Sequence, residues 1–178
     1  AVMDIIGSTF KGNIAATTGG AIDNTFYDSD TRDGSVYVAG TTFGGTGTGE
    51  GNIAANGGAI YNHISQPGDH NQNQTGNMYV INSSFLGNSA TSDGGAIYNE
   101  GVLTFTDTIF GGTAEGAGNS AKNGGAIYNK ARVTITDSTF TGNSVLVPVA
   151  EDSTYKKEGV GGSIASAGSL TISGSTFT

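Results

Sequence analysis

Three tyrosines occupy the same position in three nearly identical six-residue segments of this 178-residue chain. Each follows Gly-Gly-Ala-Ile and precedes Asn, and the three are Tyr61, Tyr98 and Tyr128. If these segments are strands of stacked coils, alternation places the tyrosines on the outer face, over the alanines two residues earlier. An outer row of tyrosines could stack sugars or contact a partner protein. Stacked aromatic residues also stabilise neighbouring strands without a ligand, and this structural interpretation is favoured.

Three carboxylates lie close together in the segment after the first Gly-Gly repeat, and they are Asp28, Asp30 and Asp33. Oxygen ligands at this density could bind a hard cation such as Ca²⁺. However, the spacing is not that of an EF-hand loop, and turns rich in Asp and Gly are common. We therefore predict no cofactor, with Ca²⁺ at these three residues as the alternative.

Both histidines of the chain, His63 and His70, lie in the second such segment with Asp69. They could form a metal site or an acid–base pair, although histidines in a polar loop are usually only solvated. The regular strands lack the paired acids of a glycosidase. Asp107 and Asp137 stand where other repeats have glycine, which indicates turn residues. We predict no catalytic residues and a protein that is not an enzyme, with a carbohydrate-active lyase or glycosidase as the alternative.

Threonine pairs recur on the outward positions of the alternating segments, at Thr104/Thr106, Thr134/Thr136 and Thr171/Ser173. Regular threonine arrays on flat β-helices resemble ice-binding faces. Here the array covers three repeats and then gives way to Tyr79 and Ile81. The strand propensity of threonine explains it well enough, so ice binding is a less favoured alternative.

The composition excludes several classes of function. The net charge of −8, with scattered basic residues, argues against binding to nucleic acid or anionic membranes. No run of apolar residues is long enough to span a membrane, and the absence of cysteine excludes disulfides. Charged residues make up only 12% of the chain, which is typical of secreted or surface-displayed β-proteins. We therefore expect an extracellular or outer-membrane surface location.

The elements that must position these residues are short strands. The Gly-Gly segment occurs five times, beginning at Gly19, Gly57, Gly94, Gly124 and Gly161. Between the copies lie a run such as 133–136 (Val-Thr-Ile-Thr) and a Ser-Thr-Phe segment, whose period-two alternation indicates strands. One unit of three short strands buries too little apolar surface to fold alone. A period of this kind therefore predicts units stacked in register, with like residues over like.

Stacking predicts four apolar columns in the interior, each with one residue per coil. The clearest is Phe10, Phe43, Phe85, Phe110, Phe140 and Phe177. Alternation also places two polar or small sets inside: the second glycine of each Gly-Gly pair, near the phenylalanine column, and the asparagine after each tyrosine. Stacked asparagines can hydrogen-bond to one another, which makes buried amides tolerable. Inserts at 23–33, 62–77 and 144–160 lengthen individual coils, and the sequence leaves their roles open.

The Gly-Gly-Ala-Ile and Phe-x-x-Asn segments resemble the repeats of chlamydial polymorphic outer-membrane proteins and of other bacterial autotransporter passengers and adhesins. They stand at 57–60, 94–97 and 124–127, and at 10–13, 85–88 and 140–143. The resemblance covers nearly all of the chain, although six extra residues separate Phe43 and Phe110 from the next Asn. It implies a right-handed parallel β-helix that is exported and displayed outside the cell.

We accordingly expect an all-β, single-stranded right-handed parallel β-helix of about five to six rungs with three short strands each. Residues 1–178 form one domain, which we expect to be part of a longer repeat array or assembly. The expected function is that of an adhesin, a stalk or a self-associating, filament-forming subunit. Its partners would be a surface protein or glycan of a host or neighbouring cell, or other copies of itself.

Overall fold

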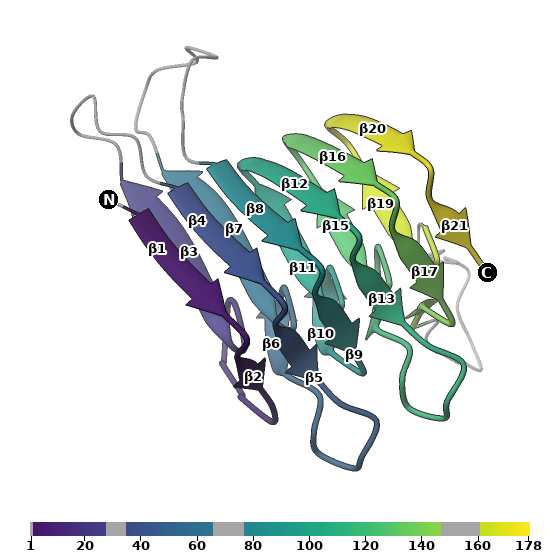
Figure 1. The fold of residues 1–178 in the computed structure, drawn as a ribbon. Coiled ribbons are helices and arrows are strands. Elements are labelled where there is room, and N and C mark those ends of the chain that lie inside the picture. The colour runs from purple at the N-terminus through teal and green to yellow at the C-terminus, as the bar shows by residue number, and fades with distance from the viewer. Residues whose placement is uncertain (1, 28–34, 66–76, 147–160) are drawn as a thin grey trace, which may run out of the picture.

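The computed structural model shows a right-handed parallel β-helix (Figure 1). The structure describes residues 2–27, 35–65, 77–146 and 161–178. Their strands form four sheets, called A to D here, and every strand pair is parallel. No helix among these residues has the length and hydrophobicity to cross a bilayer.

The strands stack in chain order within each sheet. Sheet A contains β1 (Val2–Ile6), β4 (Ser35–Ala39), β8 (Asn77–Ile81), β12 (Val102–Thr106), β16 (Arg132–Thr136) and β20 (Ser169–Ser173). Sheet B contains β2 (Thr9–Phe10), β5 (Thr42–Gly44), β9 (Ser84–Leu86), β13 (Ile109–Gly111), β17 (Thr139–Thr141) and β21 (Thr176–Phe177). Sheet C contains β6 (Ile53–Asn56), β10 (Ser89–Asp93), β14 (Ser120–Ala121) and β18 (Ser144–Val145). Sheet D contains β3 (Ile22–Tyr27), β7 (Ile60–Ser65), β11 (Ile97–Glu100), β15 (Ile127–Asn129) and β19 (Ile164–Ser166).

The predicted fold class is confirmed, but a complete coil has four short strands and not three. The additional strand is the one in sheet C, between the Phe-x-x-Asn segment and the Gly-Gly pair. Its inward residues are small, as Ala54, Ala90 and Ala121 show. Without large alternating apolar residues this segment carries no strong strand pattern, so the sequence indicated a turn there.

The interior consists of the predicted columns. Successive phenylalanine rings of sheet B lie 4.5–5.1 Å apart between centroids and within 7° of parallel. Phe105 of sheet A meets Phe110 edge to face, with centroids 5.0 Å apart. Phe43, Phe85, Phe110 and Phe140 are completely buried. Burying side chains of this size contributes about 1.5–3 kcal/mol each, so the columns account for much of the apolar stabilisation.

The Gly-Gly pairs are required by close backbone contact between coils. A Cβ on Gly58 would lie 2.1 Å from the carbonyl oxygen of Gly95 and 2.5 Å from that of Ser89. The crowding therefore comes from neighbouring backbone and not, as predicted, from the phenylalanine column. The first glycine of the pair, Gly57, has φ of +62°, a conformation that favours glycine. This turn interrupts the strand alternation, so Ala59 is completely buried in the core and not on the outer face as expected.

The predicted asparagine ladder runs through sheet D. Asn24, Asn62, Asn99 and Asn129 each lie one coil apart, and every Nδ2 donates to the next Oδ1 at 2.7–2.9 Å. The last amide donates to Ser166 Oγ at 3.0 Å. Asn62, Asn99 and Asn129 are at most 1% exposed. Each buried amide is thus satisfied by the coil beside it.

A second ladder, which the sequence analysis did not predict, connects the asparagines of the Gly-Asn pairs. Asn13, Asn52, Asn88, Asn119 and Asn143 follow one another, with Nδ2 to Oδ1 distances of 2.8–3.0 Å. Asn88 Nδ2 also donates to the carbonyl oxygen of Phe43, and Asn88 Oδ1 accepts from the backbone N–H of Asn52. The loops that precede Asn52 and Asn119 project from the coil (Figure 1) without breaking this order.

The turn between sheets A and B has a residue with positive φ in every coil. Asp107 and Asp137 have φ of 49° and 50°, as Gly7, Gly40 and Gly174 have similar values in other coils. The interpretation of both aspartates as turn residues is confirmed. The hydroxyl residue that follows also crosses between coils, since Thr108 N–H donates to Ser138 Oγ at 3.1 Å.

We predict that Phe110→Ala lowers the free energy of unfolding by about 3–5 kcal/mol, because it leaves a cavity in the middle of the column. The matched control is Ile109→Ala in the same strand, where the side chain is 46% exposed. The control should change stability by no more than about 0.5 kcal/mol. Urea denaturation of both variants measures the difference, and equal losses would contradict the assigned burial.

Candidate functional site

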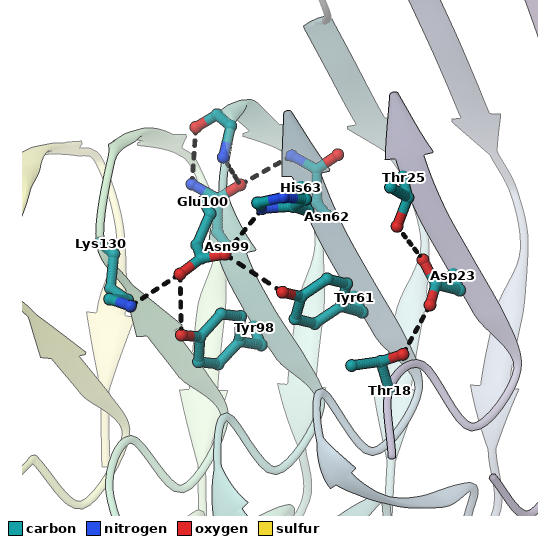
Figure 2. A network of polar contacts seen from close by, with 11 residues as sticks. Thr18, Asp23, Thr25, Tyr61, Asn62, His63, Tyr98, Asn99, Glu100 and Lys130 are labelled. Atoms are coloured by element: carbon teal, nitrogen blue, oxygen red, sulfur yellow. Dashed lines mark hydrogen bonds and ion pairs between the residues drawn. The ribbon is translucent and has the colours of Figure 1, made fainter. Parts of the chain in front are cut away.

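The densest polar cluster lies on the outer side of sheet D, where three neighbouring coils bring their strand ends together. Strands β7 and β11 pair Tyr61 with Tyr98 and His63 with Glu100 in register. Lys130 directly follows β15 and continues the row. Figure 2 shows these side chains meeting around the carboxylate of Glu100. We call Tyr61, His63, Tyr98, Glu100 and Lys130 the Glu100 cluster.

Four groups surround the two carboxylate oxygens of Glu100. Oε1 accepts hydrogen bonds from Lys130 Nζ at 2.7 Å and from Tyr98 Oη at 3.0 Å. Oε2 accepts from Tyr61 Oη at 3.1 Å and lies 2.7 Å from His63 Nδ1. The Glu100 side chain is only 20% exposed. A carboxylate that accepts several hydrogen bonds holds its neighbours in place, and its oxygens are poorly available to accept a proton from a substrate.

The electrostatics follow from this geometry. Burial opposes ionisation of Glu100, but hydrogen bonds from Lys130 and Tyr98 outweigh it and hold the pKa of the carboxyl below its usual value. The hydrogen bond to Glu100 raises the pKa of Lys130. Burial, followed by the nearby Glu100 charge, raises the pKa of Tyr61 well above its ordinary value, and burial likewise raises the pKa of Tyr98. Both phenols are therefore neutral donors at physiological pH, and not nucleophiles.

The tyrosine ladder is present in the structure, with ring centroids of Tyr61, Tyr98 and Tyr128 separated by 5.1 and 5.4 Å. It is less accessible than the sequence suggested, because Tyr98 is only 8% exposed. Its neighbours cover both ring faces, and Glu100 accepts from two of the hydroxyls. A stacked row of this kind presents ring edges to solvent, which is a poor platform for stacking sugars. A binding role for these three residues stays a prediction.

The other predicted site residues are distributed differently. Asp28, Asp30 and Asp33 lie outside the described residues, as do Asp69 and His70. Of the two histidines only His63 is described, and its Nδ1 lies 2.7 Å from Glu100 Oε2. Within the described part of the chain no three metal-ligating side chains come together. Ca²⁺ binding by the three aspartates stays a prediction.

Asp23 stands at the N-terminal end of the ladder, in register with Tyr61. Its carboxylate accepts hydrogen bonds from the hydroxyls of Thr18 and Thr25, as Figure 2 shows. Like the carboxylate of Glu100, this carboxylate accepts hydrogen bonds from side chains of the coil itself. Both acids on the face of sheet D therefore act within the scaffold.

Sequence reasoning missed Glu100 and Lys130, although a signal was present. Both occupy the position after the ladder asparagine, as His63 does in the preceding coil. Alternation turns this position outward, beside the tyrosines. Opposite charges at equivalent positions of consecutive coils predict an ion pair across about 4.8 Å, the spacing of neighbouring strands.

A shallow groove lies between the two projecting loops, around 45–51 and 115–116. Its lining consists mostly of glycine backbone, and its single ionisable side chain is Glu115. The nearby Glu50 carboxylate is turned to Lys11 Nζ at 3.1 Å and to the backbone N–H of Gly47. This groove therefore has few side chains that could bind a ligand specifically or act in catalysis.

Residues 7–25 and 82–100 match the family model of the Chlamydia polymorphic membrane protein repeat. The predicted resemblance is confirmed. The match at 82–100 runs from the turn before β9 to the end of β11, so this repeat comprises one strand each of sheets B, C and D and ends at Glu100. Neither the curated proteins nor the solved structures contain a significant match to this chain. The repeat supports a surface protein of the polymorphic membrane protein type, whereas adhesion and filament formation stay predictions.

The raised pKa of Tyr61 predicts how stability depends on alkaline pH. The folded state holds the phenolic proton more tightly than the unfolded chain, so its stabilisation is complete below the ordinary pKa of 10.0. It is lost as the pH rises above that value. In Tyr61→Phe the fall in unfolding free energy above about pH 10 should be shallower, although Tyr98 and Lys130 still contribute.

Urea denaturation between about pH 8 and pH 11 measures this slope. Tyr37→Phe is the control, because it removes a hydroxyl from sheet A, away from the Glu100 cluster. The same slope in Tyr61→Phe and in the unchanged chain would contradict the coupling between Tyr61 and Glu100.

Proposed function

We propose that this chain is a non-enzymatic segment of a cell-surface protein, acting as an adhesive β-helical module. The matched repeat supports the surface location, because its family consists of membrane proteins. The repeats also require a rigid, elongated coil, which suits the presentation of a surface to a partner. The function thus depends on the outer faces of the coil and not on a catalytic centre.

The observation that carries this proposal is how the polar side chains of the coil are used. The interior amides hydrogen-bond between coils, and Glu100, the carboxylate of the outer cluster, accepts hydrogen bonds from Lys130, Tyr98 and Tyr61. Glycoside hydrolysis needs two carboxyl groups placed across a bond, one of them able to release a proton. The Glu100 cluster has one carboxylate, whose pKa is lowered. This arrangement favours a scaffold over an enzyme.

Exposed apolar residues on the outer faces provide a surface that could contact a partner. Ile6 and Ile14 are 71% and 75% exposed, and Ile81 and Tyr37 are 45% and 43% exposed. Ile6, Tyr37 and Ile81 lie on the first three strands of sheet A, whereas Ile14 bridges to Ile53 at the start of β6 in sheet C. Apolar side chains gathered on one part of a surface are typical of interaction sites.

Self-association is a second candidate, favoured by apolar side chains on neighbouring strands of sheet A. Ile6, Tyr37 and Ile81 are 71%, 43% and 45% exposed there. Exposed apolar groups that lie together favour contact with another surface of the same kind. Sedimentation velocity at rising concentration tests this candidate.

Adhesion is tested with beads that carry the purified 178-residue chain. We expect the beads to attach to cultured epithelial cells or to bacterial cells, and beads carrying Asp30→Ala to attach equally well. The control is Phe110→Ala, which should lose attachment as its coil unfolds. Failure of the unchanged chain to attach to either cell type would contradict the proposal. Release of reducing ends from a polysaccharide that Asp30→Ala abolishes would establish the enzyme instead.

A further inference from the structure

The outer face of sheet A divides into an apolar half and a hydroxyl half. Its outward side chains form three rows in register across all six strands. The first three coils contribute most of the large apolar groups, of which Val2, Ile6, Tyr37 and Ile81 are more than 40% exposed, together with Asp4, Ser35 and Asn77. The last three coils contribute hydroxyls, namely Thr104, Thr106, Thr134, Thr136, Thr171 and Ser173.

The boundary between the halves is a step formed by Tyr79. Its ring stacks on that of Tyr37 at 5.0 Å and 10°, which covers one face of each ring. On its other side Tyr79 is in register with Thr104, a much smaller side chain. The second ring face of Tyr79 therefore looks over the threonine rows. A pyranose ring placed there would have an aromatic wall beside it and a floor of hydroxyls beneath it.

The hydroxyls of Tyr37 and Tyr79 differ from those of Tyr61 and Tyr98. Glu100 accepts hydrogen bonds from Tyr61 and Tyr98, whereas Tyr37 and Tyr79, like Tyr128 at the end of the ladder, have no hydrogen-bond partner among the described residues. Tyr37 is 43% exposed, and Tyr79 is partly exposed, whereas Tyr98 is only 8% exposed. A hydroxyl without a partner in the described part of the chain can donate to or accept from a ligand.

Charge on this face selects the kind of ligand. The strands of sheet A carry one acidic residue, Asp4, and one basic residue, Arg132, in a chain with a net charge of −8. Recognition of acidic glycans requires clustered cations, which these strands lack. A face with balanced charge and many hydroxyls fits a neutral ligand.

The area of this face indicates whether a folded protein or a single polysaccharide chain fits it better. Six strands about 4.8 Å apart, each five residues long at about 3.3 Å per residue, give a face of roughly 450 Å². Stable protein–protein interfaces bury about 800 Å² on each partner. A second copy or another folded protein would therefore need contacts beyond this face. A single polysaccharide chain lying across the strands would not.

We infer that the outer face of sheet A binds a neutral polysaccharide, with a sugar ring against Tyr79 and its hydroxyls on Thr104 and the neighbouring threonines. The inference rests on the proposed adhesive function and names the surface and the ligand class. It places the carbohydrate contact on sheet A, where among the described residues only Tyr37 stacks on Tyr79, and not on the middle of the sheet D ladder, where Tyr98 is stacked on both sides.

Biolayer interferometry with immobilised cellohexaose, mannohexaose and chitohexaose tests it, with heparin and polygalacturonate as acidic probes. The unchanged chain should bind at least one neutral probe. Tyr79→Ser should weaken that binding at least about tenfold, and Thr104→Val several-fold, by removing the wall and a floor hydroxyl respectively. Tyr128→Ser, in the ladder of sheet D, should bind as the unchanged chain does. Thermal melts confirm that all variants are folded.

Three results would overturn the inference: no binding to any neutral probe, binding to the acidic probes alone, or equal binding by folded Tyr79→Ser. Attachment of beads carrying Tyr79→Ser separates this inference from the proposed function. Undiminished attachment to cells would leave adhesion standing and place it on another face or on a protein partner. Loss of attachment together with loss of glycan binding supports both.

Discussion

Hydrogen bonds between equivalent side chains of successive coils are the constraint on which this fold depends. A coil of strands two to six residues long has few backbone partners of its own, and each must pair with the coil on either side. The asparagines extend this pairing into the interior, because each amide both donates and accepts along the axis. A ladder of this kind tolerates only one register, since a shift would leave buried amides without partners. It therefore fixes the columns that also bury the phenylalanines.

The periodicity that this constraint imposes is why the fold could be predicted. Asn62, Asn99 and Asn129, with the phenylalanine column, return at positions that must coincide in space, and the structure confirms both. The strand of sheet C escaped prediction because Ala54 and Ala90 carry no strong alternation. Ala59 was placed on the wrong face because Gly57 adopts positive φ and breaks the period of two. Pattern reasoning fails where backbone conformation, and not side-chain chemistry, decides the direction of a residue.

The candidate site was only half predictable for a related reason. The tyrosines could be predicted because they recur at the same position of each repeat. His63, Glu100 and Lys130 differ in type from coil to coil, and they form one cluster only when the coils stack. The same stacking buries Tyr98 and leaves Tyr37 accessible. Accessibility depends on what the neighbouring coils carry, which a single repeat does not reveal. Unlike side chains at equivalent positions thus give each coil its own surface, as Tyr79 beside Thr104 and His63 beside Glu100 show.

The central claim, that buried asparagine amides bind one coil to the next, is tested most directly by hydrogen exchange of the side-chain NH₂ groups in solution NMR. The Nδ2 protons of Asn88 and Asn99 are donated within the ladders, in side chains with no exposed surface. They should exchange as slowly as the backbone amides of the strands around them, because both require the coils to separate. Exchange at the rate of a solvent-exposed amide, in a chain whose backbone amides remain protected, would contradict the account.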